Sequence, residues 1–535
     1  SRARLGSGGA ATVWRVQDQD LGVLVALKVL KDTRPGFISK MEREAVLSSR
    51  VVHPNVVAVH DIGRTPDGKG YLAFALASDG TMLDVASQPP RWSELLDLTL
   101  QLLDALAAMH ARGILHLDVK LSNLLLHRAA NGKRLLWLAD LGVARALWDD
   151  DDDKSVVGTV SYMSPERLTG QHHLWCPSTD LFAVGGVLYR LITGRLPYPA
   201  RDPSEGLSQR QRPPQRVIPR AGVRVPEGLD EVLLPMLQFD RRGRYDLAAD
   251  AIRAFKNLPL LDEPPVMDNP AGHPLGSSAR GVPRWHRPPP ADPPATLPIP
   301  EVQDRRVPQA PSLLRQREIA IVGREPELEL LWRSVRTALR TGRPVLVEVT
   351  GAKGSGRTRL LNAFTRALEE AGLGEGLRMQ YAVPDGPNLG LRGAWRRVLP
   401  PGSRRDVFIR EIAATFARDR GTSMDQCVND ARLLASWLGP GEGSRTTYNR
   451  SAIRAMMVEH LERRAWRGVS WLWVEDAHLA GETDDCWAII DQLLLQQVPA
   501  VVLVDADSEQ VPASLLELRA RHHRSVRRIQ LERLR

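Results

Sequence analysis

Apolar positions along the chain fall into two blocks with different periods. In the first block, residues 23–30 form a nearly continuous apolar run, which predicts a buried strand. Residues 92–111 and 181–193 have apolar side chains at helical spacing, and the charged stretch 39–50 has helical spacing as well. We therefore predict strands with one helix over 1–75, followed by a mainly helical part with buried helices.

A stretch without any apolar period separates the two blocks. Pro, Gly and Ser dominate between residues 259 and 311, and consecutive prolines recur there. Such a composition favours an extended chain without a packed core, so we predict a Pro-rich disordered linker over 258–315. A spacer is the simpler interpretation, although the Arg and Pro residues of this segment would also suit a binding partner.

The second block, residues 316–535, alternates apolar strands with helices. Apolar runs at 345–350, 471–474 and 500–504 predict buried strands, and a helix is expected from 325 to about 339. Alternating strands and helices are typical of a parallel sheet with helices on its faces. The second block therefore predicts an α/β domain.

Length and charge narrow the class of protein. The chain has 535 residues, too many for one hydrophobic core, so two or three domains are expected. A net charge of +9 would suit nucleic acid or an acidic membrane, but a solvated surface with a basic linker explains it more simply. No apolar run approaches the roughly 18 residues of a membrane helix. We expect neither a nucleic-acid nor a membrane partner.

The cysteines and the start of the sequence bear on location and completeness. Cys176, Cys427 and Cys486 are widely spaced, which is typical of a reducing compartment and offers no metal cluster. No signal peptide is visible, so a cytoplasmic location is expected. The sequence starts at Ser1, without Met, and enters a glycine-rich loop almost at once. We therefore expect a fragment with a clipped first strand.

One short stretch carries the strongest chemical signal. It runs His116-Leu117-Asp118-Val119-Lys120-Leu121-Ser122-Asn123, and Asp140-Leu141-Gly142 follows downstream. Asp118 can orient and deprotonate an attacking hydroxyl, and Lys120 can neutralise the moving phosphate. Asn123 and Asp140 can hold magnesium against a nucleotide. The stretch therefore predicts phosphoryl transfer.

This stretch resembles the catalytic loop and the Asp-Phe-Gly motif of Ser/Thr protein kinases, and further motifs of that family follow in order. They are Gly6-Ser7-Gly8-Gly9-Ala10-Ala11-Thr12-Val13, Val25-Ala26-Leu27-Lys28, Glu44, Gly158-Thr159, Ser164-Pro165-Glu166, Asp180 and Arg244. The resemblance covers about residues 1–257. It implies an α+β bilobal protein-kinase fold, with an N lobe at about 1–78 and a C lobe at about 79–257.

The resemblance also implies a role for each motif residue. Lys28 would bind the α- and β-phosphates of ATP and be held by Glu44, which also explains a lysine on an apolar strand. Asp118 would accept the substrate proton, Lys120 would contact the γ-phosphate, and Asn123 and Asp140 would ligate Mg²⁺. The remaining contacts with ATP would come from the glycine-rich loop, the apolar strand and the hinge, with Phe74 as gatekeeper: Gly6, Ser7, Gly8, Gly9, Val13, Ala26, Ala75 and Ala77.

The implied activity is that of a non-specific serine/threonine protein kinase acting in signalling. Its cofactors would be ATP and Mg²⁺, and its partners would be proteins that offer Ser or Thr hydroxyls, the chain itself included. Lys120 and Gly158-Thr159 match the Ser/Thr pattern rather than the tyrosine pattern. A pseudokinase scaffold is the alternative, but it typically lacks Lys28, Asp118 or Asp140, and all three are present. The oligomeric state is open.

Three departures from the kinase pattern carry information. Ala11 replaces the third glycine of the loop, and Leu141 replaces Phe while keeping an apolar plug. Leu117 replaces the Arg that in the family binds an activation-loop phosphate, and the loop carries a run of five Asp at 149–153. We therefore hypothesise activity without activation-loop phosphorylation. Ser155, Thr159 and Ser161 stay candidate autophosphorylation sites.

The second block carries a strand, a glycine-rich loop and a helix in the order of a P-loop. The loop is Gly351-Ala352-Lys353-Gly354-Ser355-Gly356-Arg357-Thr358, and Val474-Glu475-Asp476-Ala477-His478 ends a later strand. With Val322-Gly323-Arg324-Glu325, these residues resemble the AAA/STAND-type P-loop ATPase modules found behind some bacterial kinases. The resemblance implies a truncated module of this kind at 316–535.

Nucleotide contacts in this module would come from Gly351, Gly356, Arg357 and Thr358, with a second magnesium at Thr358, Glu475 and Asp476. Arg357 stands where the family has Lys, and the planar guanidinium is a poor replacement for a compact ammonium. We expect weak or absent hydrolysis, and leave open nucleotide binding and a docking scaffold. A further alternative is a nucleotide-driven signalling switch in this domain, with the kinase as its output.

Overall fold

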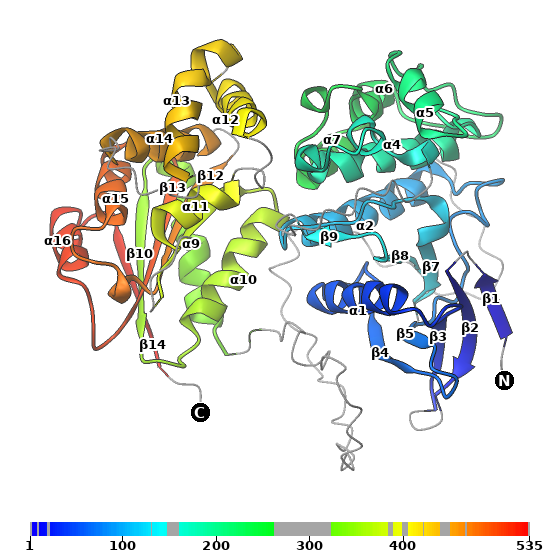
Figure 1. Ribbon diagram of the computed structural model, residues 1–535, viewed down its shortest axis with the longest axis horizontal. Helices are drawn as coiled ribbons and strands as arrows, with labels where there is room; N and C mark the ends of the chain where they lie inside the picture. Colours follow the sequence, from blue (N-terminus) through cyan, green and yellow to red (C-terminus); the bar gives the residue numbers. More distant parts are fainter. Residues whose placement is uncertain are drawn as a thin grey trace.

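The computed structural model describes residues 3–7, 10–18, 22–129, 131–146, 160–259, 261, 321, 323–382, 389–398, 405–420, 422–438, 450–465 and 468–532. Gly8, Gly9, Val322, the acidic run with Ser155 and Thr159, and most of the predicted linker therefore lie outside the described residues. The described parts form two units, one built on an antiparallel sheet and one on a parallel sheet (Figure 1).

An antiparallel sheet with one helix opens the first unit, as the N-terminal pattern predicts. Its strand order is β1-β2-β3-β5-β4, and every neighbouring pair is antiparallel. The strands are β1 (Ala3–Ser7), β2 (Ala11–Gln17), β3 (Leu24–Leu30), β4 (Val59–Arg64) and β5 (Gly70–Ala75). Helix α1 (Pro35–Arg50) packs against β4 and β5. It begins four residues before the predicted start, because Pro35 supplies a preset helical φ at the first position.

The rest of the first unit is mainly helical and surrounds one apolar core. Its long helices are α2 (Trp92–His110) and α4 (Pro177–Thr193), and both are buried, as predicted. The shorter helices are α3 (Pro165–Leu168), α5 (Pro203–Arg210), α6 (Leu229–Leu233) and α7 (Ala248–Lys256). Two small antiparallel pairs hold the segments between α2 and α3: β6 (Ile114–Leu115) with β9 (Arg145–Ala146), and β7 (Leu124–Arg128) with β8 (Arg134–Leu138).

The second unit is a parallel sheet of order β11-β12-β13-β10-β14. The strands are β10 (Val345–Gly351), β11 (Gly374–Gln380), β12 (Val469–Glu475), β13 (Ala500–Asp507) and β14 (Val526–Leu531). The three predicted strands are β10, β12 and β13, which are almost wholly buried, as strands covered on both faces must be. The edge strands β11 and β14 were not predicted, because glycines in one and arginines in the other interrupt the apolar pattern.

Helices cover both faces of the parallel sheet. The helices are α9 (Glu325–Thr341), α10 (Arg357–Glu370), α11 (Gly390–Val398), α12 (Arg405–Arg420), α13 (Met424–Leu438), α14 (Arg450–Arg464), α15 (Asp485–Leu495) and α16 (Ala513–Arg521). On one face, α9 and α10 pack against Trp471 and Trp473 of β12. On the other face, α11 to α15 pack against Leu472 and Val474 of the same strand. The two faces of one strand thus build two separate cores.

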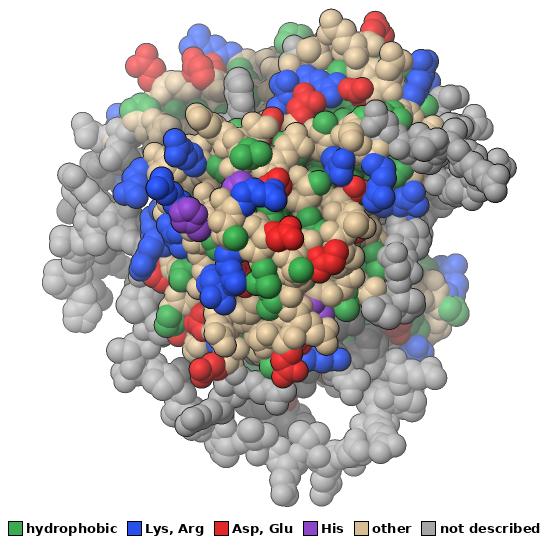
Figure 2. Space-filling model, turned by 90° about the vertical axis from the view of Figure 1, so that its left-hand side faces the viewer, with side chains coloured by type: hydrophobic (Ala, Val, Ile, Leu, Met, Phe, Trp, Pro, Cys, Tyr) green, Lys and Arg blue, Asp and Glu red, His purple; other side chains and the backbone are tan. Residues whose placement is uncertain are grey.

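The surface carries mixed charge. Figure 2 shows the outer face of the second unit, where acidic, basic and apolar side chains are interspersed and the basic ones are densest toward one edge. Within the described residues, no helix combines the length and the apolar character needed to cross a bilayer.

Candidate active site

The lysine of the apolar strand lies in a cluster of opposite charges. Lys28 Nζ on β3 donates to both carboxylate oxygens of Glu44 on α1, at 2.7 and 2.9 Å, and to Asp140 Oδ1 at 2.8 Å. The structure therefore brings together three residues that lie up to 112 positions apart in the sequence. The Lys28–Glu44 pair holds helix α1 close to the sheet. It also places the Lys28 ammonium group where phosphates could replace part of its contacts.

The protonation of this cluster follows from burial and from the lysine. Burial by itself lowers the pKa of Lys28, but Glu44 and Asp140 outweigh it and hold that pKa above its usual value. Burial raises the pKa of Glu44 above its usual value, against the attraction of Lys28. Burial also acts to raise the pKa of Asp140, but Lys28 more than offsets it and the net pKa is lowered. Asp140 is thus an ionised carboxylate at neutral pH.

The predicted base lies in a tight arrangement of hydrogen bonds. Lys120 Nζ donates to Asp118 Oδ2 at 2.6 Å, and Asn123 Nδ2 donates to the same oxygen at 3.1 Å and to the Asp118 carbonyl at 2.9 Å. The Ala139 amide donates to the Asn123 carbonyl at 2.9 Å, which ties this loop to the segment that carries Asp140. The structure thus places all four predicted phosphoryl-transfer residues on adjoining segments.

The catalytic loop has a strained backbone that a buried carboxylate stabilises. Leu117 has φ +64°, a conformation that a branched side chain seldom adopts. Asp180 on α4 accepts hydrogen bonds from the amides of His116 and Leu117 at 2.9 and 2.7 Å, and from His110 Nε2 at 2.9 Å. Burial acts to raise the pKa of Asp180, but the His110 hydrogen bond and nearby charges lower it overall. The ionised Asp180 therefore fixes the backbone directly before Asp118.

Two arginines that the sequence analysis missed hold the surroundings of this loop. Arg167, in α3, donates to the carbonyl of Leu117 and lies over the ring of Trp175, with 5.6 Å to the ring centroid. Arg210, in α5, is fully buried and donates to the carbonyls of Val160 and Met163 at 2.8 and 2.7 Å. Burial lowers the pKa of Arg210 to about 10, so the group stays charged at neutral pH.

These contacts bear on the hypothesis about activation-loop phosphorylation. The loop's acidic run lies outside the described residues, but the end of the activation segment begins at Val160. Arg210 donates to the backbone carbonyls at that end, of Val160 and Met163. Arg167 donates to the carbonyl of Leu117, the residue that stands where kinases of the resembling family have Arg. Both arginines contact backbone carbonyls, so these contacts do not depend on the identity of the side chain they reach. Activity without activation-loop phosphorylation stays a prediction.

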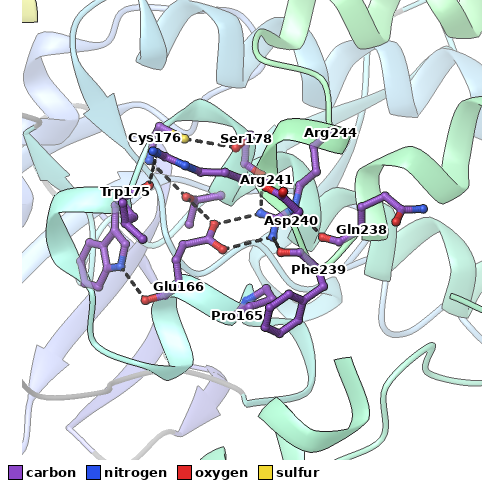
Figure 3. A network of polar contacts seen from close by, with 12 residues as sticks. Pro165, Glu166, Trp175, Cys176, Ser178, Gln238, Phe239, Asp240, Arg241 and Arg244 are labelled. Carbon is purple, nitrogen blue, oxygen red and sulfur yellow. Dashed lines mark hydrogen bonds and ion pairs between the residues drawn. The ribbon is translucent and has the colours of Figure 1, made fainter. Parts of the chain in front are cut away.

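A buried ion pair anchors the segment after the catalytic loop (Figure 3). Arg244 Nη1 and Nη2 pair with the two Glu166 oxygens at 2.9 and 3.1 Å, and Thr179 Oγ1 donates to Glu166 Oε1 at 2.9 Å. Arg244 also donates to the carbonyls of Gln238 and Phe239 at 2.8 and 3.0 Å. Burial acts to raise the pKa of Glu166, but Arg244 outweighs it and lowers that pKa.

The predicted nucleotide-contact residues of the glycine-rich loop and hinge lie on neighbouring strands. Gly6 pairs with Val13 across β1 and β2, and Val13 pairs with Lys28 across β2 and β3. Ala26 pairs with Phe74 on β5, next to Ala75. Ser7 pairs with Thr12, and Ala77 lies two positions after the end of β5. Gly6, Val13, Ala26 and Phe74 therefore align with Lys28 on one face of the sheet, whereas Ser7 and Ala75 lie at alternate positions of their strands. Their contacts with ATP stay a prediction.

Oxygen donors suited to magnesium are present beside the base. Asn123 uses its amide nitrogen on Asp118, so its amide oxygen is the atom that it offers to a cation. Asp140 offers an ionised carboxylate. Hard cations such as Mg²⁺ prefer ligands of this kind, so both residues fit the metal that phosphoryl transfer uses. When bound, the metal would neutralise charge on the transferring phosphate.

The second unit has a P-loop-like site at the carboxyl ends of its strands. The loop leaves β10 at Gly351 and enters α10 through Gly356, whose φ of +91° suits glycine. Arg324, before α9, donates to the Ser355 carbonyl at 3.0 Å and so fixes the loop from outside. Thr358 lies in the first turn of α10. Glu475 ends β12 and Asp476 follows it, as predicted.

The Arg357 side chain is bound by other groups of the protein. Its guanidinium donates to the Gly351 carbonyl and forms ion pairs, each 3.5 Å long, with Asp476 and Asp505. Asp505 is fully buried at the end of β13 and accepts from Trp473 Nε1 at 2.7 Å. Burial raises the pKa of Asp505 to about 6. Asp505 was not predicted as a site residue, because it lies in an apolar strand with no motif around it.

Glu475, one of the predicted magnesium ligands of this unit, also forms an ion pair within the protein. Arg378 on β11 donates to Glu475 Oε2 from Nε at 2.8 Å and from Nη2, and its guanidinium lies 4.2 Å from the ring centroid of Trp473. Glu475 is nearly inaccessible to solvent. Two of the charged groups predicted to act on a nucleotide in this unit, Arg357 and Glu475, therefore form ion pairs inside the protein. This arrangement fits the expectation of weak or absent hydrolysis.

Replacing Arg357 with Lys is expected to strengthen nucleotide binding by the second unit about tenfold or more. A lysine is too short to keep both carboxylates and the Gly351 carbonyl, and its ammonium suits β- and γ-phosphates. Binding of a fluorescent ATP analogue would be titrated in a chain that also carries Lys28→Met, so that the first site contributes little. Adding Thr358→Ala should cancel the gain. An unchanged affinity in Arg357→Lys would contradict this account.

Comparison with known families and proteins agrees with both units. Residues 1–252 match the protein kinase domain family, and residues 320–526 match the AAA ATPase domain family. The serine/threonine-protein kinase pkn3 of Myxococcus xanthus is 30% identical over 268 residues, which cover 47% of this chain and 48% of that protein.

Two further relatives give the same result. PknA of Mycobacterium tuberculosis (strain ATCC 25618 / H37Rv) is 30% identical over 52% of this chain and 66% of its own length. PrkC of Bacillus subtilis (strain 168) is 31% identical over 46% of this chain and 38% of its own length. Both are named serine/threonine-protein kinases. The matched part is thus about half of this chain and between 38% and 66% of these relatives.

Proposed function

Because the chain joins a protein kinase domain at residues 1–252 to an AAA ATPase domain at residues 320–526, we propose that it is a signalling Ser/Thr protein kinase with an attached regulatory module. The observation that carries the proposal is the Lys28–Glu44–Asp140 cluster beside the Asp118–Lys120–Asn123 loop. A scaffold without transfer activity has no need of this complete set. Its assembly favours the enzyme over the pseudokinase.

The proposed reaction follows from these positions. A Ser or Thr hydroxyl of a protein substrate gives its proton to Asp118, and its oxygen forms a bond to the γ-phosphorus of ATP. The bond between that phosphorus and the β,γ-bridging oxygen breaks, and ADP leaves. Lys28 holds the non-transferred phosphates, and Lys120 lies 2.6 Å from the base, where it can stabilise charge on the moving group. Catalysis is then mostly positioning and electrostatics.

The proposal extends to the substrates, the location and the role of the second domain. The substrates are proteins with Ser or Thr hydroxyls, and the chain's own Ser161 is a candidate for autophosphorylation. Its hydroxyl donates a hydrogen bond to the Ala200 carbonyl at 3.3 Å. This hydrogen bond has to break before the hydroxyl can accept a phosphate. A reducing cytoplasm suits the three cysteines, which are all free thiols. The second domain would act on the kinase through its position, since Arg357 and Glu475 are engaged internally.

Phosphate transfer by the 535-residue chain tests the proposal. The chain would be incubated with radiolabelled ATP and a basic protein, with Mg²⁺ or with excess EDTA, and the labelled product would be hydrolysed to identify the modified residue. We expect phosphoserine or phosphothreonine with Mg²⁺ and loss of transfer with EDTA, because the cation that Asn123 and Asp140 would hold neutralises charge on the transferring phosphate. Folded chain that binds Mg-ATP without transfer would favour the pseudokinase instead.

A further inference from the structure

The two domains meet at the end of a helix that begins at the P-loop. Helix α10 starts at Arg357, directly after the glycine-rich loop, and ends at Glu370. It packs against α2 of the kinase domain. In Figure 1, the end of α10 reaches the end of α2 where the two units approach each other. One helix therefore spans the distance from the P-loop to the kinase.

An ion pair joins the ends of these two helices. Arg112, two residues after α2, pairs through Nη1 with Glu370 Oε1 at 2.5 Å. The same nitrogen donates to the Ala108 carbonyl at 2.7 Å, which fixes the guanidinium against the last turn of α2. The side chain of Arg112 is only 12% exposed and that of Glu370 33% exposed, so the pair is partly shielded from water.

A close backbone approach lies beside the ion pair. Gly372 follows α10 with φ +59°, and a Cβ atom at this position would lie 2.3 Å from Cβ of Ala249 in α7. Arg253 Nη1 of α7 donates to the Gly372 carbonyl at 3.2 Å. Only glycine fits this turn and this separation. Three kinase residues, Arg112, Ala249 and Arg253, thus contact one turn of the second domain.

The ion pair lies close in sequence to the catalytic loop. Six positions after Arg112 comes Asp118, and the intervening strand β6 pairs with β9 at the start of the activation segment. His110, at the end of α2, donates to Asp180, which holds the strained backbone before the base. Arg112 therefore lies between the end of α2, which contacts Asp180, and strand β6, which leads into the catalytic loop.

We propose that the AAA ATPase domain docks on the kinase domain through the α10 end and that this docking stabilises the catalytic loop in its competent arrangement. The kinase surface thus binds residues 370–372 of the same chain, and the interface is regulatory. The proposal rests on the proposed kinase activity. Arg112 lies six positions before Asp118, so loss of the contact with Glu370 is expected to loosen the segment that leads into the catalytic loop and to lower transfer.

Charge reversal in the 535-residue chain tests the interface. Glu370→Arg places two cations together and should open the interface, and Arg112→Glu should act in the same way. The double variant Arg112→Glu/Glu370→Arg restores an attractive pair. The radius of gyration would be measured by small-angle X-ray scattering, and the rate of phosphate transfer by radiolabelled ATP. Glu329→Arg is the matched control, since Glu329 pairs with Arg336 within α9, at 2.5 Å.

We expect each single reversal to increase the radius of gyration and to lower the transfer rate about fivefold or more, a typical allosteric coupling. The double variant should restore both, and Glu329→Arg should change neither. An unchanged radius in both single variants would overturn the interface. A larger radius with an unchanged rate would overturn its regulatory role. If the unmodified chain transferred no phosphate, the scattering result would still decide the docking, separately from the proposed function.

Discussion

Replacing Asp118 with Asn is expected to lower the rate of phosphate transfer by about 10²–10⁴-fold, the usual contribution of a positioned general base. The substitution keeps the shape of the side chain but removes its ability to accept a proton. ATP should still bind with nearly unchanged affinity, because Lys28 and Asp140 lie on other segments. The turnover number should therefore fall while KM for ATP stays similar. Steady-state kinetics with a saturating protein substrate measure both.

A matched control is available on α2. Asp97 accepts from Lys133 Nζ at 3.1 Å and from Gln101 Nε2 at 2.8 Å, so it receives one ammonium and one amide, as Asp118 does. Asp97→Asn makes the same chemical change outside the site and should leave the rate within about twofold, as surface substitutions usually do. Equal losses in both variants would point to destabilisation. Full activity in Asp118→Asn would remove Asp118 from the mechanism.

The fold was largely predictable because its signals are local. Continuous apolar runs predicted β3, β10, β12 and β13, and helical spacing predicted α2, α4 and α9. The edge strands β11 and β14 were missed for a physical reason. An edge strand has one neighbour and can expose one face, so the arginines of β14 are tolerated there. Gly374 and Gly376 of β11 instead lie against the carbonyls of Val469 and Trp471, where an added Cβ atom would clash.

The site was predictable where its residues belong to one short motif. Asp118, Lys120 and Asn123 lie within six positions, and their geometry follows from one loop. The residues that hold that loop come from distant elements. Arg167 and Arg210 donate to backbone carbonyls, and because every residue has one, the sequence of the accepting residue does not indicate the contact. Backbone contacts of this kind depend on tertiary packing alone. The same holds for Arg112 with Glu370, which are 258 positions apart.

The ion-pair partners of the charged groups in the second unit could not be predicted from the sequence either. The substitution at Arg357 was visible, and so was Glu475 at the end of a strand. Their partners, Asp505 and Arg378, lie on neighbouring strands that pair only in the folded sheet. The sequence could therefore indicate a weakened P-loop without indicating how the surrounding charges are neutralised.

Replacing Arg244 with Ala is expected to destabilise the kinase domain by about 3–5 kcal/mol, because it leaves Glu166 buried without its cation. The variant also loses the hydrogen bonds to Gln238 and Phe239 and the contact with the ring of Phe182, 4.9 Å away. For a domain of this size, such a loss lowers the melting temperature by about 6–20 °C. Thermal unfolding followed by circular dichroism measures it.

The stability difference between the unmodified protein and Arg244→Ala should depend on pH. Arg244 lowers the pKa of Glu166 below its ordinary value of 4.5, so the pair stabilises the folded state above that pH. The stabilisation is lost as the pH falls through the lowered pKa. In Arg244→Ala, burial acts without the cation and raises the pKa of Glu166. The gap between the two proteins should therefore be large at pH 7 and should shrink toward pH 4.

An exposed pair of equal length separates burial from charge as the cause. Arg216 pairs with Asp230 at 2.9 Å, the same distance as Arg244 Nη1 to Glu166 Oε1, but its side chain is 86% exposed. Because water screens such a pair, Arg216→Ala should cost at most about 1 kcal/mol. The double variant Glu166→Leu/Arg244→Met removes both charges and should be more stable than Arg244→Ala. Equal destabilisation by Arg216→Ala and Arg244→Ala would show that burial is not the cause.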